Sequence, residues 1–184
     1  MAPVNHRKVV MLGYSSVGKS SLAIQFMKGD FPTDYEPTYA NNWSKTFVMG
    51  GEEFELEVVD TAGQDEYSLL PQSFFIGIHG YIVVYSVDCS RSFQIAQTLY
   101  TILVDRRGKC LIPIVLVGNK NDVPNQCRKV TFEDGKKLAE SWGAAFMEVS
   151  AKDPERSKQI FTKMIEEINR IERSFTQDKC CNVM

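Results

Sequence analysis

No apolar stretch of this 184-residue chain approaches the length of about 20 residues that a membrane-spanning helix needs. The first eight residues also lack the apolar core of a secretory signal peptide, so we expect no export signal there. Neither sign of charge is in excess, because 21 Lys and Arg stand against 23 Asp and Glu, for a net charge of −2. This balance gives no general attraction to nucleic acid, and we predict no nucleic-acid partner.

Cysteine is sparse and irregularly spaced. The five cysteines are Cys89, Cys110, Cys127, Cys180 and Cys181. An odd number without paired spacing fits neither a zinc site nor a disulfide framework, so reduced thiols in a cytoplasmic protein are the better interpretation. Internal repeats and low-complexity segments are also missing from the sequence. The remaining composition, 43% hydrophobic and 24% charged, is that of an ordinary globular chain with enough residues for one full core.

The most informative stretch is residues 13–20, which match the phosphate-binding pattern G-x-x-x-x-G-K-[ST]. An apolar run precedes it and a helix-like segment follows it, which is the context that the pattern requires. Backbone N–H groups of such a loop surround a β-phosphate. Lys19 would supply a charge to the β- and γ-phosphates, and the Ser20 hydroxyl could ligate Mg²⁺. The candidate nucleotide-binding residues here are Ser16, Val17, Gly18, Lys19, Ser20 and Ser21.

The spacing of apolar residues predicts an α/β fold. Residues 43–49 and 53–59 alternate in polarity on either side of Gly50-Gly51, which is typical of an antiparallel hairpin. Residues 81–85 and 112–117 are continuously apolar, like parallel strands buried on both faces. Helical patterns begin near Ser90 or Ser92, either of which would be the cap, and again at Thr131 and Pro154. At Thr131, Asp134 three residues later gives a capping-box-like start. We predict a three-layer, doubly wound sheet of six mostly parallel strands with one antiparallel edge strand.

A second polar stretch, residues 60–64, follows the returning strand of the hairpin. Asp60 could hold Mg²⁺ through a water molecule, and Gly63 could offer its backbone N–H to a γ-phosphate. Gln64 could orient an attacking water. The candidate catalytic residues are therefore Gln64, Lys19 and Gly63. Alone, this stretch could equally be a glycine turn with a capping Asp, but its position after a phosphate loop favours the functional interpretation.

Residues 119–122 and 150–152 indicate which base is bound. The two carboxylate oxygens of Asp122 can accept the N1–H and 2-amino groups of guanine, whereas adenine would leave the carboxylate unpaired at a cost of roughly several kcal/mol. Asn119 can brace the loop, and the stem of Lys120 can lie along the base and ribose. The candidate residues are Asn119, Lys120, Asp122, Ser150 and Ala151, the last through its N–H to guanine O6. A small-molecule kinase is disfavoured, because these residues select guanine and no arginine-rich lid follows.

Across residues 7–175 the chain resembles the Ras superfamily of small GTPases. Within it, residues 60–68, residues 138–142 and the tail ending in Met184 most resemble the Rheb and Rheb-like subfamily. The resemblance implies a P-loop G domain covering residues 1–175 that binds GTP or GDP with Mg²⁺ and hydrolyses GTP as a switch in signal transduction. It further implies that Thr38 ligates Mg²⁺ and that Tyr35 folds over the nucleotide.

The resemblance also implies partners, namely a GTPase-activating protein that supplies an asparagine, a possible exchange factor and an effector kinase complex of the TOR type. The implied effector region is Tyr35, Glu36, Pro37, Thr38, Tyr39, Ala40, Asn41, Asn42 and Trp43. It departs from Rheb at Tyr39 and Ala40, where Rheb has an aliphatic and an acidic residue, so the effector is left open. Ser15 also departs, since Ras proteins have a glycine and Rheb an arginine there. We expect Ser15 to slow intrinsic hydrolysis; a GTP-binding regulatory module with negligible turnover is the alternative.

The last four residues, 181–184, fit the C-a-a-X lipidation pattern. We expect a flexible tail over residues 176–184, in which a prenyltransferase attaches a farnesyl group to Cys181 and processing leaves a methyl ester. Cys180 could be palmitoylated or remain unmodified. One lipid gives only marginal binding, and no run of basic residues assists it, so we expect peripheral attachment to endomembranes.

Overall fold

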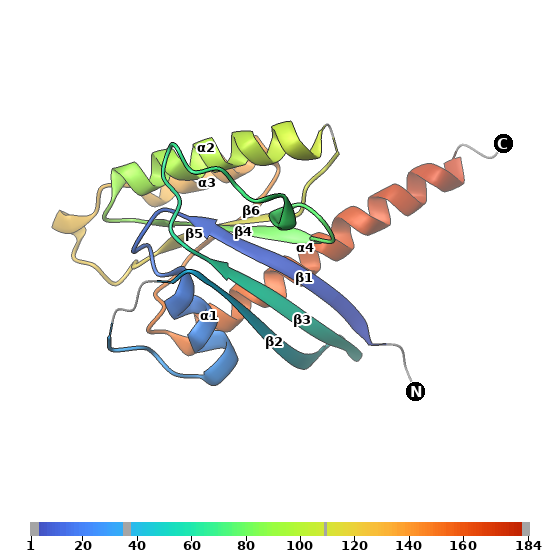
Figure 1. Cartoon of the computed structure of the whole chain (residues 1–184), viewed down its shortest axis with the longest axis horizontal. Coiled ribbons are helices and arrows are strands. Elements are labelled where there is room, and N and C mark those ends of the chain that lie inside the picture. Colours follow the sequence, from blue (N-terminus) through green and yellow to red (C-terminus); the bar gives the residue numbers. More distant parts are fainter. Residues whose placement is uncertain (1–3, 35–37, 109, 182–184) are drawn as a thin grey trace.

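A computed structural model describes residues 4–34, 38–108 and 110–181, with side chains up to residue 176. Strands and helices alternate along the chain (Figure 1). The elements are β1 (Asn5–Gly13), α1 (Lys19–Lys28), β2 (Ala40–Met49), β3 (Glu52–Thr61), η1 (Gln72–Phe74), β4 (Gly80–Ser86), α2 (Ser90–Arg107), β5 (Ile114–Asn119), η2 (Asn125–Cys127), α3 (Phe132–Trp142), β6 (Ala145–Glu148) and α4 (Pro154–Cys181).

The strands form one six-stranded sheet in the order β2-β3-β1-β4-β5-β6. All neighbouring pairs are parallel except β2 and β3, which are antiparallel and joined at Gly50-Gly51. Both glycines have positive φ, 60° and 82°, which a tight two-residue turn requires. The predicted fold class, including its antiparallel edge strand, is therefore confirmed.

Two helices cover each face of the sheet, which gives the three layers seen in Figure 1. Apolar residues of α1 and α4 pack on one face and those of α2 and α3 on the other. A stripe of apolar residues on α4 is buried in the first of these cores, namely Ile160, Met164, Ile165 and Ile168. Ile171, one turn further along the helix, is also buried. Because the parallel strands all end at the same edge, the loops after β1, β3, β4, β5 and β6 are brought together there.

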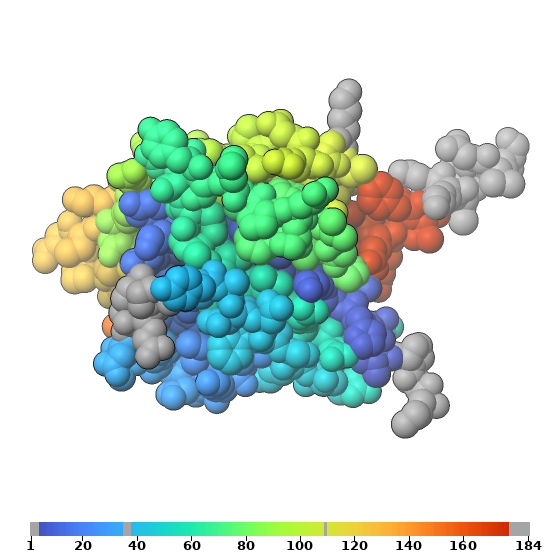
Figure 2. Space-filling model, viewed as in Figure 1, coloured from blue at the N-terminus to red at the C-terminus, as the bar shows by residue number. Residues whose placement is uncertain are grey.

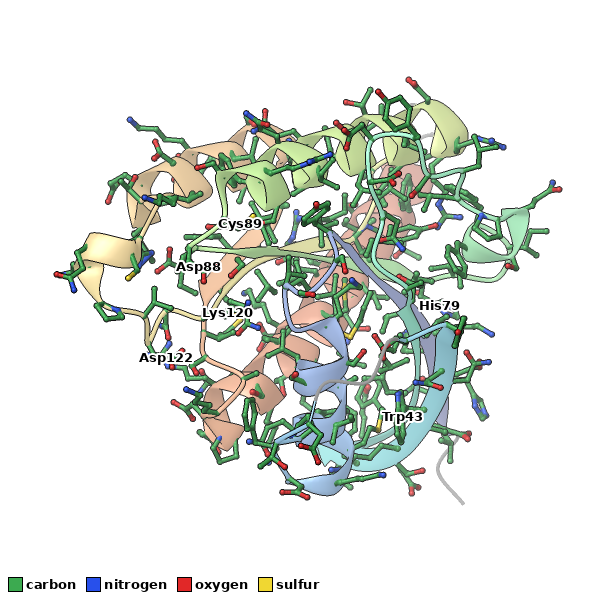
Figure 3. The ribbon with its side chains drawn as sticks, turned by 60° about the vertical axis from the view of Figure 1, so that its left-hand side comes forward. Trp43, His79, Asp88, Cys89, Lys120 and Asp122 are labelled. Carbon is green, nitrogen blue, oxygen red and sulfur yellow. The ribbon has the colours of Figure 1, made fainter. Side chains whose placement is uncertain are left out.

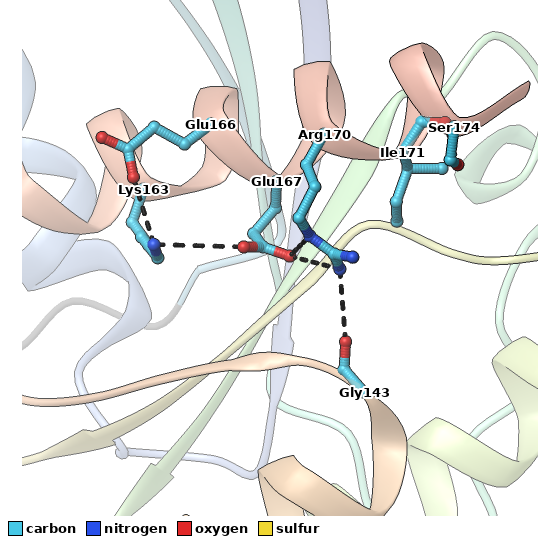
Figure 4. A network of polar contacts seen from close by, with 7 residues as sticks. All are labelled: Gly143, Lys163, Glu166, Glu167, Arg170, Ile171 and Ser174. Atoms are coloured by element: carbon cyan, nitrogen blue, oxygen red, sulfur yellow. Dashed lines mark hydrogen bonds and ion pairs between the residues drawn. The ribbon is translucent and has the colours of Figure 1, made fainter. Parts of the chain in front are cut away.

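A polar network fixes α4 against the end of α3 (Figure 4). The Glu167 carboxylate is buried and accepts from the Arg170 guanidinium at 2.8 Å, and Arg170 also donates to the backbone carbonyl of Gly143 at 3.4 Å. Lys163 lies 4.0 Å from the same carboxylate. Removing one partner of such a pair would leave a buried charge uncompensated, so the network holds α4 in one position.

Helix α4 runs six residues past the expected domain boundary at residue 175 and ends at Cys181. Residues 172–181 contain neither proline nor glycine, so no residue there interrupts the helix. The described part of the expected tail is thus helical, and residues 182–184 lie outside the described residues. Among the residues that could be searched, no helix combines the length and the apolar character needed to cross a membrane.

The start of α2 differs from the sequence-based expectation, while the start of α3 agrees with it. Cys89, and neither expected serine, occupies the N-cap of α2. Ser92 instead uses its hydroxyl to accept from the Ser86 amide at 2.9 Å and to donate to the Cys89 carbonyl at 2.7 Å, which ties the helix to the end of β4. Thr131 caps α3 together with Asp134 in a reciprocal capping box, as predicted.

Gly135 marks the tightest contact between α3 and the sheet. A Cβ added there would lie 2.3 Å from the Tyr85 hydroxyl oxygen and 2.6 Å from the Phe146 ring. Tyr85 is fully buried, and its hydroxyl has no hydrogen-bond partner among the described residues. Burial raises the pKa of this hydroxyl, so it stays protonated.

We predict that Gly135→Ala destabilises the protein. Alanine gains about 1 kcal/mol of helix propensity over glycine, but overpacking against two rigid side chains costs about 1–3 kcal/mol. Tyr85→Phe, which removes an unpaired hydroxyl, should be neutral or stabilising by about 1 kcal/mol, and it should restore part of the loss in the double variant. Urea unfolding at a fixed GDP concentration gives the free energy of unfolding of the two single variants and of the double variant. A Gly135→Ala protein as stable as the wild type would contradict this account.

Candidate functional site

The phosphate-binding loop, residues 13–20, has a backbone that only glycine permits at two positions. Gly13 and Gly18 have φ values of 155° and 96°. A Cβ on Gly13 would lie 2.2 Å from the Val84 carbonyl oxygen, and one on Gly18 would lie 2.3 Å from the Asn119 amide nitrogen. Ser16 is a non-glycine residue with positive φ, 60°. This strained backbone turns successive N–H groups toward a common centre at the start of α1, which is suited to an anion.

Lys19 is buried under this loop, with 5% of its surface exposed. Its ammonium donates to the carbonyl oxygens of Gly13 at 2.9 Å and Tyr14 at 3.0 Å. Burial lowers the pKa of Lys19 to about 8, against the opposing effect of the Asp60 carboxylate. A polyphosphate beside the ammonium would stabilise its charged form, so the group is arranged for an anionic ligand.

Three oxygen-bearing side chains lie next to the loop. The hydroxyls of Ser20 and Thr38 are 2.6 Å apart. Asp60 is fully buried, and neither of its carboxylate oxygens has a hydrogen-bond partner among the described residues. Burial raises the pKa of Asp60, while Ser20 and Lys19 lower it. An unpaired buried carboxylate beside two hydroxyls is a donor set that suits a hard divalent cation. The structure thus places together the two hydroxyls expected to ligate Mg²⁺ and the carboxylate expected to act through a water.

Gln64 is turned into the protein and is 6% exposed. Its side-chain oxygen accepts from the Gly13 amide at 2.9 Å, and its side-chain nitrogen donates to the Thr61 hydroxyl at 2.9 Å and to the Ala62 carbonyl. Its backbone N–H donates to the Gly13 carbonyl at 3.0 Å. In this conformation both ends of the side-chain amide are engaged, and Gln64 could act on a water only after these bonds exchange.

Ser15 lies directly against Gly63. A Cβ on Gly63 would approach the Ser15 Cα to 2.4 Å and its Cβ to 2.8 Å. The phosphate loop and the loop after β3 are therefore in backbone contact at this point. Any side chain at position 63 would push the two loops apart.

A cavity of about 230 Å³ lies on the α1 side of the loop, where a base is expected. Its lining residues are Gly18, Ser21, Phe31, Asn119, Lys120, Asp122, Val123, Ser150, Ala151 and Lys152. Lys152 forms an ion pair with Asp122 at 3.0 Å. Burial raises the pKa of Asp122, but hydrogen bonds from Lys152 and Ser150 lower it more, so this carboxylate remains ionised at neutral pH.

Asn119 joins the phosphate loop to the loop after β6. It is 1% exposed, its side-chain nitrogen donates to the Val17 carbonyl at 2.8 Å, and its oxygen accepts from the Ala151 amide at 3.1 Å. The Ala151 amide, which we expected to meet guanine O6, is therefore engaged by Asn119 in this structure. The Ala151 carbonyl accepts from Gln25 of α1 at 3.1 Å, which completes the connection.

A second cavity, of about 440 Å³, lies on the other side of the phosphate loop. Residues of the loop line it together with Ser86, Asp88, Cys89 and Lys120. Figure 3 shows Asp88, Cys89, Lys120 and Asp122 on the same side of the molecule, at the ends of β4 and β5, away from Trp43 and His79. Lys120 borders both cavities and has a positive φ of 65°, so its stem lies between them.

The expected effector region begins outside the described residues, which exclude Tyr35, Glu36 and Pro37. Tyr39 is 91% exposed, and Ala40, Asn41 and Asn42 are exposed at the start of the edge strand β2. Trp43 differs, because it is partly buried against the core, with the Lys28 ammonium 5.1 Å from its ring. Figure 2 shows the surfaces near residue 40 and near residues 65–78 on one face of the molecule.

Several residues of this site were not predicted from the sequence. Phe31 lines the base-side cavity from the long loop after α1, and only the length of that loop pointed to it. Asp88 and Cys89 lie beside the phosphate loop because β4 ends there. Their sequence carries no motif, so only the order of the strands could have identified them.

Comparison with known proteins gives an independent result. Residues 8–170 match the family model described as Ras family. The Mus musculus protein named GTPase RhebL1 is 53% identical over the full length of both chains. The Homo sapiens GTP-binding protein Rheb is 48% identical over 97% of each chain, and the Drosophila melanogaster GTP-binding protein Rheb homolog is 46% identical over 89% of each.

We predict that Asn119→Ala weakens both the fold and nucleotide binding. The substitution leaves a buried carbonyl and a buried amide without partners, at a cost of about 2–4 kcal/mol. Because the two loops lose their connection, GDP should dissociate at least about tenfold faster, which corresponds to about 1.4 kcal/mol. Urea unfolding and the release rate of a fluorescent GDP measure the two effects. Asn125→Ala, in the adjacent η2, is the matched control; equal GDP release from both variants would refute the proposed connection.

Proposed function

Since the chain belongs to the Ras family and is a GTPase of the Rheb-like kind, we propose that its intrinsic hydrolysis is slow and needs an activating protein. The chain binds GTP and GDP and works as a switch between the two states. Its intrinsic hydrolysis rate sets how long the GTP-bound state lasts, and its effector is the protein that this state binds.

The engaged side chain of Gln64 is the observation that carries this proposal. Three hydrogen bonds hold its amide among Gly13, Thr61 and Ala62. A water-orienting amide has to be free to meet the water, so hydrolysis waits for these bonds to exchange. The inward, hydrogen-bonded conformation lowers the fraction of molecules in which the Gln64 amide is free to orient a water. The observed hydrolysis rate is reduced in proportion to that fraction.

Ser15 adds a second restraint. Its contact with the Gly63 backbone leaves no free space between the two loops that would flank a γ-phosphate. An arginine supplied by a partner would have to enter at the same place, so we propose that the activating protein supplies a smaller polar group, an asparagine.

We propose Mg²⁺ as the resident cation, held by Ser20 and Thr38, with Asp60 acting through a water. The fit rests on the unpaired buried carboxylate and the adjacent hydroxyls. When bound, the cation neutralises charge on the phosphates. Thr38 follows the long loop after α1, so we propose that the conformation of this loop depends on the γ-phosphate. Tyr35 is proposed to close over the nucleotide and lies outside the described residues.

We propose that partner proteins bind the face shown in Figure 2, and that an effector kinase complex of the TOR type is one of these partners. Tyr39, Tyr67 and Leu69 are 91%, 85% and 90% exposed. No residue from Thr38 to Ser44 is charged. An exposed surface of aromatic and apolar side chains fits a partner with an apolar patch. An activating protein and an exchange factor would contact the same loops.

A second candidate is a GTP-binding regulatory module whose turnover is negligible and whose effector is different. The same hydrogen bonds of Gln64 support this second candidate if they do not break within the lifetime of the GTP-bound state. Single-turnover hydrolysis with and without an activating protein separates the two, because the module would not respond to the activating protein.

We also propose that Cys181 is farnesylated and carboxyl-methylated by the prenylation machinery, and that the chain is cytoplasmic and peripheral on endomembranes. The support is the sequence of residues 181–184. A single lipid without adjacent basic residues gives weak, reversible attachment.

Ser15→Gly should accelerate intrinsic single-turnover hydrolysis by about tenfold, equivalent to about 1.4 kcal/mol of barrier. The substitution removes the side chain that packs on Gly63 and gives Gln64 room to leave its pocket. Ser141→Gly, on the exposed end of α3, is the control and should hydrolyse GTP at the wild-type rate. If Ser15→Gly also matches the wild type, Ser15 does not restrain hydrolysis.

In fractionated cells, Cys181→Ser should move the protein from the membrane pellet to the supernatant. Cys180→Ser should leave most of it in the pellet, because the prenylation acceptor is intact. If equal fractions of Cys181→Ser and wild-type protein are found in the membrane pellet, the proposed farnesylation of Cys181 is wrong.

A further inference from the structure

The segment directly after Gln64 is a compact turn. The Asp65 carboxylate accepts from the Tyr67 amide at 3.0 Å and from the Ser68 hydroxyl at 2.8 Å, and the Asp65 amide donates to that hydroxyl at 2.9 Å. These bonds make residues 65–68 one rigid unit. A backbone movement that carries Gln64 outward therefore moves this unit too.

One side chain from another element holds the unit in place. Arg91, the second residue of α2, donates to the Glu66 carboxylate at 2.7 Å. Its guanidinium also lies 5.5 Å from the centre of the Tyr14 ring, within the range of a cation–π contact. Arg91 thus connects the turn after Gln64 to the residue that follows Gly13.

The position of Arg91 is not explained by the stability of α2. The start of a helix favours negative charge, and the first turn of α2 has no acidic residue that Arg91 could offset. Its side chain is 56% exposed, so burial does not explain it either. Its two contacts, with Glu66 and Tyr14, both belong to loops of the nucleotide site.

Two links thereby join the same pair of loops. Gln64 bonds to Gly13 through both its backbone and its side chain. Arg91 joins Tyr14 to Glu66. Tyr14 is one residue after Gly13 in the phosphate loop, and Glu66 is two residues after Gln64 in the loop that follows β3. To bring the Gln64 amide outward, its bonds to Gly13 have to break. Meanwhile Arg91 still holds the two loop backbones at a fixed separation.

We propose that Arg91 is a positioning residue that keeps the Gln64 segment in its inward conformation and so restrains GTP hydrolysis. This inference rests on the proposed function, in which release of Gln64 limits the intrinsic rate. An exposed ion pair contributes little to global stability, so its loss should leave the fold intact and act on the local equilibrium. We expect about a twofold to fivefold gain in rate, because loss of one exposed ion pair changes the free energy by at most about 1 kcal/mol.

The first test is single-turnover hydrolysis in the full chain loaded with GTP. Arg91→Ala and Glu66→Gln should each accelerate hydrolysis, and the double variant should add nothing, because both remove the same link. Arg106→Ala is the matched control, an arginine near the other end of α2, about 22 Å away along the helix axis. It should behave as the wild type. In a Gln64→Leu background the gain from Arg91→Ala should disappear.

A second readout is independent of the rate. With a non-hydrolysable GTP analogue bound, amide hydrogen exchange over residues 62–70 should be faster in Arg91→Ala than in Arg106→Ala. Unchanged exchange would overturn the proposal. Faster exchange without faster hydrolysis, or a gain that persists with Gln64→Leu, would also overturn it. A wild type that hydrolyses GTP rapidly would instead refute the proposed function, while the exchange result would still decide whether Arg91 holds this segment.

Discussion

The nucleotide site depends on two buried amide side chains that hold the phosphate loop from either side. Gln64 bonds to Gly13 at the beginning of the loop, and Asn119 bonds to Val17 near its end. Buried backbone groups need partners, and here the partners come from the loops after β3 and β5. The strained conformation of the loop is therefore a property of the assembled sheet, since both side chains reach it only because their strands end at the same edge. The same two amides also connect the loop to the γ-phosphate side and to the base side.

This arrangement combines a stable scaffold with buried charges that lack full compensation. Lys19 has a lowered pKa, and Asp60 has a raised one with no hydrogen-bond partner among the described residues. A nucleotide with a divalent cation would compensate both, so binding would stabilise the fold by the free energy that its concentration supplies. The inward position of Gln64 has the opposite effect on catalysis, because the bond that supports the loop withholds the amide from the water. The slow hydrolysis that we propose would then follow from the way the loop is supported.

Much of this could be predicted from sequence, and the exceptions have physical causes. The strand pattern, the hairpin at Gly50-Gly51 and the capping box at Thr131 all depend on local spacing, and the structure confirms them. The inward rotamer of Gln64 depends on an amide 51 residues away, which no local pattern reveals. Arg91 was missed for a related reason, since its two contacts are made only after two loops and the start of α2 have come together. Helix α4 also runs beyond the expected domain boundary at residue 175, which followed the resemblance, because residues 172–181 contain no helix breaker.

The central claim is that these loops form one guanine-selective, cation-dependent site whose parts are coupled through the phosphate loop. The most direct measurement is calorimetric titration of the nucleotide-free chain with GDP and ADP, each with Mg²⁺ and with a chelator. The account predicts tight GDP binding that weakens on chelation, and ADP binding weaker by at least about a thousandfold, about 4 kcal/mol, because adenine offers Asp122 neither an N1–H nor a 2-amino donor. Comparable affinity for GDP and ADP, or GDP affinity indifferent to Mg²⁺, would contradict it.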